Sequence, residues 1–244
     1  MSLSSDLQDR EWCKQPKGTD IIWRYMDFSK YVSLLTTETL WFSRVDKFED
    51  PYEGMPTAKD LERLSKGNKR ERSVVIEHFK EKSKKVFANC WYKNRGQSDA
   101  MWKLYPNSQQ GVAIKSVVSD VRSAIKSSYE PIFANVHYID WEQNRIPPNS
   151  VLAPSLHKRE AFEHEKEMRI LIRHESWDDL STHPYARSST PSGLQVQVEL
   201  NDLIKEVFTS PKASEWFHTT VEDITGKYVS KPVNSSKLYD PISN

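Results

Sequence analysis

Short apolar and aromatic runs, separated by charged and turn-forming segments, recur along the chain and limit what it can fold into. Runs typical of strands occupy residues 21–25, 40–43, 86–92, 111–114, 132–138, 168–172, 194–198 and 207–209. Helical spacing or helix-capping residues mark residues 28–35, 57–85, 98–105, 116–127, 156–164 and 213–225, with a break near 67–68. Helices and strands do not alternate regularly, which argues against a doubly wound sheet. The sequence therefore predicts an α+β fold with a central, mainly antiparallel sheet flanked by helices.

The aromatic content shows that a chain of this polarity can still build a large core. Eight Trp, ten Tyr and nine Phe stand among 244 residues, and each ring buries on the order of 150–250 Å². A single domain of this length is ordinary. We expect one α+β domain over residues 20–230, a flexible N-terminal segment over 1–19 and a flexible tail over 231–244. The Ser, Thr and Pro content of residues 174–192 predicts a long surface loop.

Charge, cysteine and glycine usage exclude several classes of protein. Thirty-five Lys and Arg balance thirty-four Asp and Glu, so no overall field attracts nucleic acid or anionic lipid. No apolar run approaches the roughly 20 residues that span a bilayer, and the N-terminus lacks a secretory signal, so no membrane partner is expected. Cys13 and Cys90 form no metal-binding or disulfide pattern, which favours a reducing, cytoplasmic location without a metal. The chain also lacks the glycine-rich phosphate loops and the nucleophile elbow.

The densest charged cluster lies at residues 158–169 and contains Glu165, Glu167 and Arg169. If a strand begins near Glu165, these three side chains share one face, and Met168 and Ile170 share the other. Two carboxylates about 7 Å apart at an effective dielectric of about 20 repel by roughly 2.4 kcal/mol. In a cleft this repulsion raises one carboxyl pKa, as acid–base catalysis can exploit. The alternative is a solvated helix in which Glu165 pairs with Arg169.

Two further groups of residues are candidates for a site, and each also has a simpler interpretation. Asp50 and Glu53 supply carboxylates around Pro51, where Asp before Pro also favours a plain turn. Trp102 and Tyr105 lie three apart on an expected helix, where they can stack a planar ring or pack in the core.

Several of these segments together resemble a bacterial family called domain of unknown function 2971. The resemblance rests on the ordered segments 40–43, 48–53, 101–105, 111–114 and 165–169, and it covers roughly residues 20–175. The family name implies no activity.

A second resemblance is to ADP-ribosyltransferases, whose pattern has Arg or His on a first strand, a hydroxyl residue on a second and a late Glu. Arg24, Ser43 and Glu167 stand in that order, and residues 165–167 look like the Glu-x-Glu loop of those enzymes. The resemblance implies that Glu167 stabilises the oxocarbenium-like transition state and Glu165 orients the acceptor. It also implies that Arg24, with Tyr25 beside it, and Ser43 bind NAD. The usual Ser-Thr-Ser strand is absent, because residues 41–44 read Trp-Phe-Ser-Arg.

The leading hypothesis is therefore an NAD-using ADP-ribosyltransferase-like enzyme of a bacterial toxin or phage-defence kind, acting on a protein or nucleic-acid acceptor. A rival hypothesis is a binding or interaction module without chemistry. A third is a nucleic-acid-processing protein, because residues 66–85 are rich in Lys and Arg, although Glu71, Glu77 and Glu81 interrupt them. Salt-dependent retention of DNA or RNA distinguishes this third class.

Overall fold

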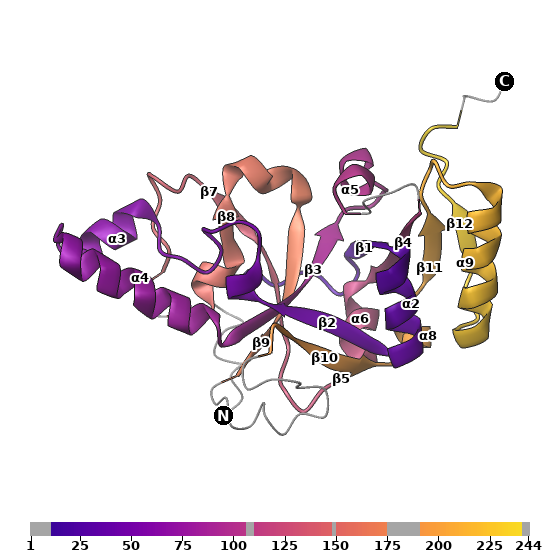
Figure 1. Cartoon of the computed structure of the whole chain (residues 1–244), viewed down its shortest axis with the longest axis horizontal. Helices are drawn as coiled ribbons and strands as arrows, with labels where there is room; N and C mark the ends of the chain where they lie inside the picture. Colours follow the sequence, from indigo (N-terminus) through magenta and orange to yellow (C-terminus); the bar gives the residue numbers. More distant parts are fainter. Residues whose placement is uncertain (1–10, 106–109, 148–149, 175–190, 241–244) are drawn as a thin grey trace. The chain divides into compact units, whose positions relative to one another are not determined.

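The computed structural model describes residues 11–105, 110–147, 150–174 and 191–240 (Figure 1). Its contacts group the chain into two compact units, and each unit is assembled from segments that are far apart in sequence. The first unit comprises Met1–Pro16, Trp41–Cys90 and Ser127–Gln195. The second comprises Lys17–Leu40, Trp91–Lys126 and Val196–Asn244. The predicted fold class is confirmed: helices accompany a mainly antiparallel sheet.

The first unit contains the strand order β6–β9–β3–β2–β10. These strands are β2 (Thr39–Arg44), β3 (Val86–Lys93), β6 (Ile132–Asn135), β9 (Glu167–Arg173) and β10 (Gly193–Val198). A separate parallel pair joins β7 (His137–Ile139) to β8 (His157–Arg159). A core of Val86, Ala134, Leu156, Leu171 and other apolar residues packs within this unit. The boundaries between the two units cut through β2, β3 and β10.

Two helices of the first unit, α3 (Ala58–Ser65) and α4 (Lys69–Ser83), form a hairpin that Figure 1 shows with its helices side by side. Thr57 caps α3 by accepting the Asp60 amide, and Asn68 caps α4 by accepting the Arg70 amide. Between them Gly67 takes a φ of 75°, which favours glycine. The predicted break near residues 67–68 is confirmed.

The second unit is built around β1 (Ile21–Asp27), which pairs along its whole length with β4 (Gly111–Val117). β11 (Glu206–Thr209) extends this antiparallel arrangement, and β12 (Val233–Ser235) pairs with β11 in parallel. The short strand β5 (Ile125–Lys126) pairs with the end of β10. Residues 233–235, within the segment predicted as a flexible tail, thus form a paired strand.

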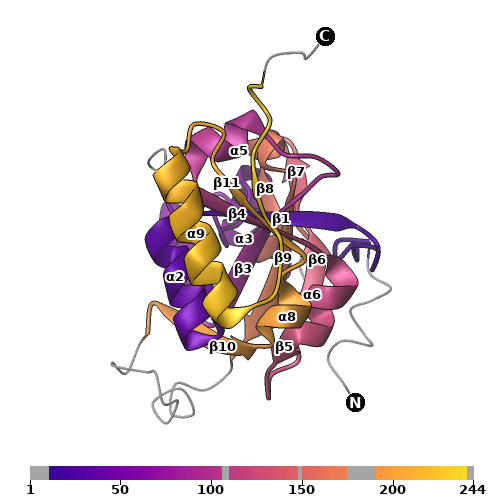
Figure 2. The ribbon, with the colours of Figure 1, turned by 90° about the vertical axis from the view of Figure 1, so that its right-hand side faces the viewer.

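Each helix of the second unit comes shortly after a strand in the sequence. They are α2 (Phe28–Thr37), α5 (Asp99–Leu104), α6 (Val118–Ala124), α8 (Leu200–Leu203) and α9 (Glu215–Tyr228). Asp27 caps α2 by accepting the Lys30 amide at 2.8 Å, as the sequence predicts. Figures 1 and 2 both show α2 beside α9, where a buried hydrogen bond of 2.8 Å joins the Tyr31 and Thr225 hydroxyls.

The prediction of a helix over residues 156–164 is wrong. The segment forms a 3₁₀ helix (Ala153–Leu156), then strand β8, then a second 3₁₀ helix (Glu160–Glu165). Long-range pairing decides this local structure, because β8 pairs with β7 and its Lys158 and Arg159 side chains reach carboxylates distant in sequence. The strand expected from near Glu165 begins at Glu167.

The ends of the chain and the predicted loop lie partly outside the described residues. Residues 1–10, 175–190 and 241–244 are not described, so most of the predicted 174–192 loop falls there. Within the predicted flexible segment 1–19, Trp12 and Cys13 are buried in the core of the first unit. Within the described residues, no helix combines the length and apolar character needed to cross a membrane.

Candidate functional site

Strand β9 places the Arg169 guanidinium at the centre of a buried network of charges in the first unit. Arg169 has no exposed surface, and all five of its N–H donors are used. Nε and Nη2 donate to Glu167 Oε2 at 2.9 and 2.6 Å. Nη1 and Nη2 each donate a hydrogen bond of 2.8 Å to one carboxylate oxygen of Glu53. Nη1 also donates to the Ser155 carbonyl at 2.7 Å. Arg169 therefore connects β9 to Glu53, which is 116 positions away in sequence, and to the 3₁₀ helix Ala153–Leu156.

Lys158, from β8, is the second cation of this network and contacts three carboxylates. Its Nζ lies 2.7 Å from Glu165 Oε2, 3.5 Å from Glu53 Oε1 and 3.8 Å from Glu167 Oε2. The Phe162 ring covers the ammonium at 4.6 Å. All of these charged side chains are buried. We call Glu53, Lys158, Glu165, Glu167 and Arg169 the charge network.

The charge network leaves one negative charge in excess, because three carboxylates face two cations. Burial alone would raise the pKa of Glu167, but Arg169 and Lys158 outweigh it and hold that pKa below its usual value, with help from the Cys90 thiol. Burial and the neighbouring Glu167 raise the pKa of Glu165, although Lys158 opposes them. Two neighbouring carboxylates thus have pKa values pushed in opposite directions, as in many acid–base sites.

Another ion pair lies at a partly exposed edge of the same unit. Arg159 Nη2 donates to Asp50 Oδ1 at 2.9 Å. The Arg159 guanidinium lies over the Tyr52 ring at 4.3 Å and over the Phe162 ring at 5.3 Å. Asp50 also accepts the Tyr52 amide at 3.1 Å, so the predicted turn chemistry and the charged contact are both present.

The structure brings several predicted site residues together and decides between the two interpretations of the 165–169 segment. Glu53, Glu165, Glu167 and Arg169 all belong to the charge network. The solvated-helix alternative is wrong, since β9 is a strand and these side chains are buried. Glu167 and Arg169 share a strand face, as the alternation predicts.

Sequence reasoning missed the role of Lys158. It lies in the charged cluster, but local periodicity placed it on a helix. Only its pairing with Glu53, distant in sequence, shows its function in the network.

Ser43 lies half-buried on β2, opposite Ala88 of β3 in the first unit. The remaining predicted residues belong to the second unit. Arg24 and Tyr25 are adjacent on β1, and Arg24 is half-buried. The Tyr25 ring packs edge-on to Trp102 of α5 with centroids 4.9 Å apart, while Tyr105 is exposed.

The Tyr25 hydroxyl has a structural partner in the same unit. It accepts a hydrogen bond from the Ser98 amide at 3.0 Å, where α5 begins. Burial raises the pKa of Tyr25 well above its ordinary value. Trp102 donates through Nε1 to Gln97 at 3.0 Å. Core packing, the simpler interpretation of Trp102, is thus observed.

Comparisons with known proteins add a distant structural likeness. The chain matches no family model and no curated protein, so its resemblance to domain of unknown function 2971 stays a prediction. DarT of Thermus sp. 2.9 in complex with carba-NAD+ shares 10% identity at a TM-score of 0.36, over 90% of this chain and 96% of that one. DarT in complex with NAD+ shares 10% at 0.34, over 92% and 98%. At this level the likeness carries no argument about activity.

Proposed function

We propose that the chain cleaves the nicotinamide–ribose bond of NAD and transfers the ADP-ribosyl group to an acceptor, with the charge network as its catalytic centre. The observation that carries this proposal is the excess negative charge shared by Glu165 and Glu167. NAD carries a positive charge on its nicotinamide ring, and that charge moves onto the ribose as the bond breaks. A buried, net-negative cluster stabilises both.

The residues divide the chemistry between them in this proposal. The C1′–N1 bond breaks, and its electron pair moves to the ring nitrogen, which leaves as neutral nicotinamide. The Glu167 carboxylate, held ionised by Arg169 and Lys158, stabilises the oxocarbenium ion that remains. An acceptor hydroxyl or water adds to C1′ and gives its proton to Glu165. The raised pKa of Glu165 makes it a stronger base than an ordinary carboxylate.

Arg169 and Lys158 are positioning residues in this scheme. All N–H groups of Arg169 donate hydrogen bonds to Glu53, Glu167 or the Ser155 carbonyl, so Arg169 holds the Glu167 carboxylate in one orientation. Lys158 positions Glu165 in the same way, because its Nζ lies 2.7 Å from Glu165 Oε2 and 3.8 Å from Glu167 Oε2. The proposal also includes Arg24 at the NAD diphosphate, Ser43 at the nicotinamide ribose and Tyr25 as a further NAD-binding residue. In each case the expected effect of Ala substitution is a higher KM for NAD.

Nicotinamide release from NAD by the pure protein tests the proposal directly. We expect Glu167→Gln to lower the rate by about 10²–10³-fold, because a preorganised charge is lost. Glu165→Gln should lower transfer by about 10²-fold or more through loss of the base. Glu160→Gln is the matched control, since Glu160 is an exposed carboxylate just before the same segment, and it should leave the rate unchanged.

Labelled NAD, offered with protein, DNA and RNA acceptors, then distinguishes transfer from hydrolysis. Label on one class of acceptor identifies the substrate, and free ADP-ribose alone indicates hydrolysis. Circular dichroism and thermal unfolding establish that each variant is folded. Background release by the folded wild type with every acceptor contradicts the proposal and favours the interaction-module hypothesis.

A further inference from the structure

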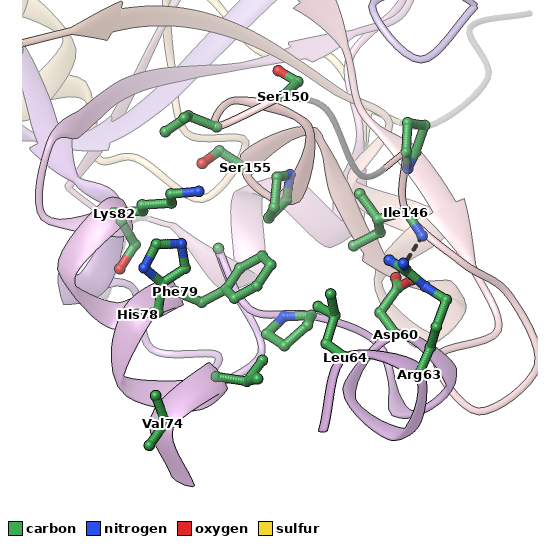
Figure 3. A pocket seen from close by; sticks show the side chains of 17 residues that line it. Asp60, Arg63, Leu64, Val74, His78, Phe79, Lys82, Ile146, Ser150 and Ser155 are labelled. Carbon is green, nitrogen blue, oxygen red and sulfur yellow. Dashed lines mark hydrogen bonds and ion pairs between the residues drawn. The ribbon is translucent and has the colours of Figure 1, made fainter. Parts of the chain in front are cut away.

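A cavity of about 310 Å³ lies in the first unit between the α3–α4 hairpin and residues 146–147 and 150–155. Figure 3 shows Phe79, His78 and Lys82 of α4 on one side, and Asp60, Arg63 and Leu64 of α3 on the other. Its volume is at the lower end of the range for small-molecule sites, which is about 300–1,000 Å³. None of the catalytic roles proposed above uses it.

Most of the lining is apolar. Leu64, Val75 and Phe79 face the cavity from the helices, and Ile146 and Pro154 face it from the opposite segment. Leu64 is 38% exposed, so part of this apolar surface is open to solvent. Removing such surface from water is worth about 25 cal/mol per Å², which favours an apolar ligand body.

The cavity lining carries more positive than negative charge, and this excess favours an anionic ligand. Asp60 Oδ2 accepts from the Ile146 amide at 2.7 Å and from the Thr57 hydroxyl at 2.9 Å. Asp60 Oδ1 is buried and accepts no hydrogen bond from the described residues, and it lies 3.7 Å from Arg63 Nη2. This pair is neutral overall.

Lys82 supplies the remaining charge. Its ammonium lies 6.0 Å from the Phe79 ring centroid, and it forms no ion pair with the described residues. The neighbouring Glu81 pairs with Lys84 instead. His78 also lines the cavity and packs edge-on to Phe79. The cavity therefore combines an apolar interior with one uncompensated positive charge.

We propose that this cavity binds a small organic monoanion, an aromatic or branched aliphatic carboxylate, with its apolar body against Phe79 and Leu64 and its anionic group at Lys82. The polar atoms of Arg63 and Asp60 at the other side fit a donor or acceptor group on the ligand body. The cavity adjoins the charge network at Ser155, which lines the cavity and accepts a hydrogen bond from Arg169. No proposed catalytic role uses the cavity, and its occupancy does not depend on NAD cleavage.

Calorimetric titration with 3-phenylpropionate and its neutral amide, 3-phenylpropanamide, tests this inference. We expect the carboxylate to bind in the millimolar range or tighter, and at least tenfold more tightly than the amide, because a charge-assisted hydrogen bond is lost. Lys82→Gln should weaken carboxylate binding by about tenfold and leave the amide unchanged. Lys80→Gln, an exposed lysine on the same helix, should change neither.

Two further variants locate the ligand. Val75→Trp should fill the cavity and abolish binding of both probes, while Glu167→Gln should leave both affinities unchanged and so separate this site from the charge network. Equal affinities for the carboxylate and the amide, or full carboxylate affinity in Lys82→Gln, overturn the assignment of the charge. Full affinity in Val75→Trp, or no heat with either probe at millimolar concentration, overturns the cavity as the binding site.

Discussion

The two units of this chain stabilise their interiors in different ways. In the first, Arg169 and Lys158 are buried among three glutamates and join the segments Trp41–Cys90 and Ser127–Gln195 of the unit. In the second, aromatic rings of Trp23, Tyr25 and Trp102 pack on one another and on Tyr92 and Phe208. The first interior thus adds directional charged contacts to its apolar core, and the second adds ring contacts.

This difference predicts how each unit responds to change. Removing one member of a buried ion pair leaves the other charged and without a partner, which costs far more than the pair contributes. Ring contacts tolerate substitutions that conserve volume, since their energy is spread over many atoms. Charged contacts also fix a carboxylate in one orientation, as the proposed role of Glu167 requires.

The largest effect should come from Arg169→Leu. The substitution leaves Glu53 and Glu167 buried without their main partner, so we expect the free energy of unfolding to fall by about 3–5 kcal/mol. Denaturant unfolding followed by circular dichroism measures it. Arg159→Leu is the matched control, because its ion pair with Asp50 is partly exposed, and it should cost less than about 1 kcal/mol. Similar losses in the two variants contradict the proposed importance of the buried network.

The contrast also explains how far the sequence alone could predict this fold and site. Alternation of apolar residues located β9, and capping residues located α2 and the break between α3 and α4, because these signals are local. The structure of residues 156–165 could not be predicted in this way. Lys158 and Arg159 find their partners Glu53 and Asp50 about a hundred positions earlier. No local period encodes such a pairing, so the local pattern predicts a helix at these charged residues.

Acid should weaken the first unit more than the second, and His157 is the main cause at mildly acidic pH. Burial lowers the pKa of His157 from 6.5 to about 4, although its hydrogen bond to the Ala153 carbonyl opposes this shift. The folded state therefore resists protonation that the unfolded chain accepts. The contribution of His157 to the free energy of unfolding is complete well above pH 6.5. It is lost as the pH falls towards 4, by up to about 1.4 kcal/mol per pH unit.

Hydrogen exchange between pH 7 and 4, corrected for the intrinsic exchange rate, measures this loss for each unit. Peptides around β8 and β9 should lose protection before peptides around β1 and β4. His157→Asn keeps a donor for the Ala153 carbonyl but does not titrate, so it should flatten the pH dependence. Glu165 acts in the opposite direction, because its raised pKa favours the folded state as the carboxyl becomes protonated. Equal loss of protection in both units contradicts this prediction.

The smallest effect is expected in the aromatic interior, from Tyr25→Phe. The ring contact with Trp102 survives, but the Ser98 amide loses its acceptor, so stability should fall by about 1 kcal/mol. Tyr228→Phe, at an exposed position, is the control and should change stability by less than about 0.5 kcal/mol.

Tyr25→Phe also separates the structural role of Tyr25 from its proposed role in binding NAD. A modest loss of stability with an unchanged KM for NAD assigns the hydroxyl to positioning α5 alone. A raised KM at unchanged stability contradicts the packing interpretation and assigns the hydroxyl to the ligand instead.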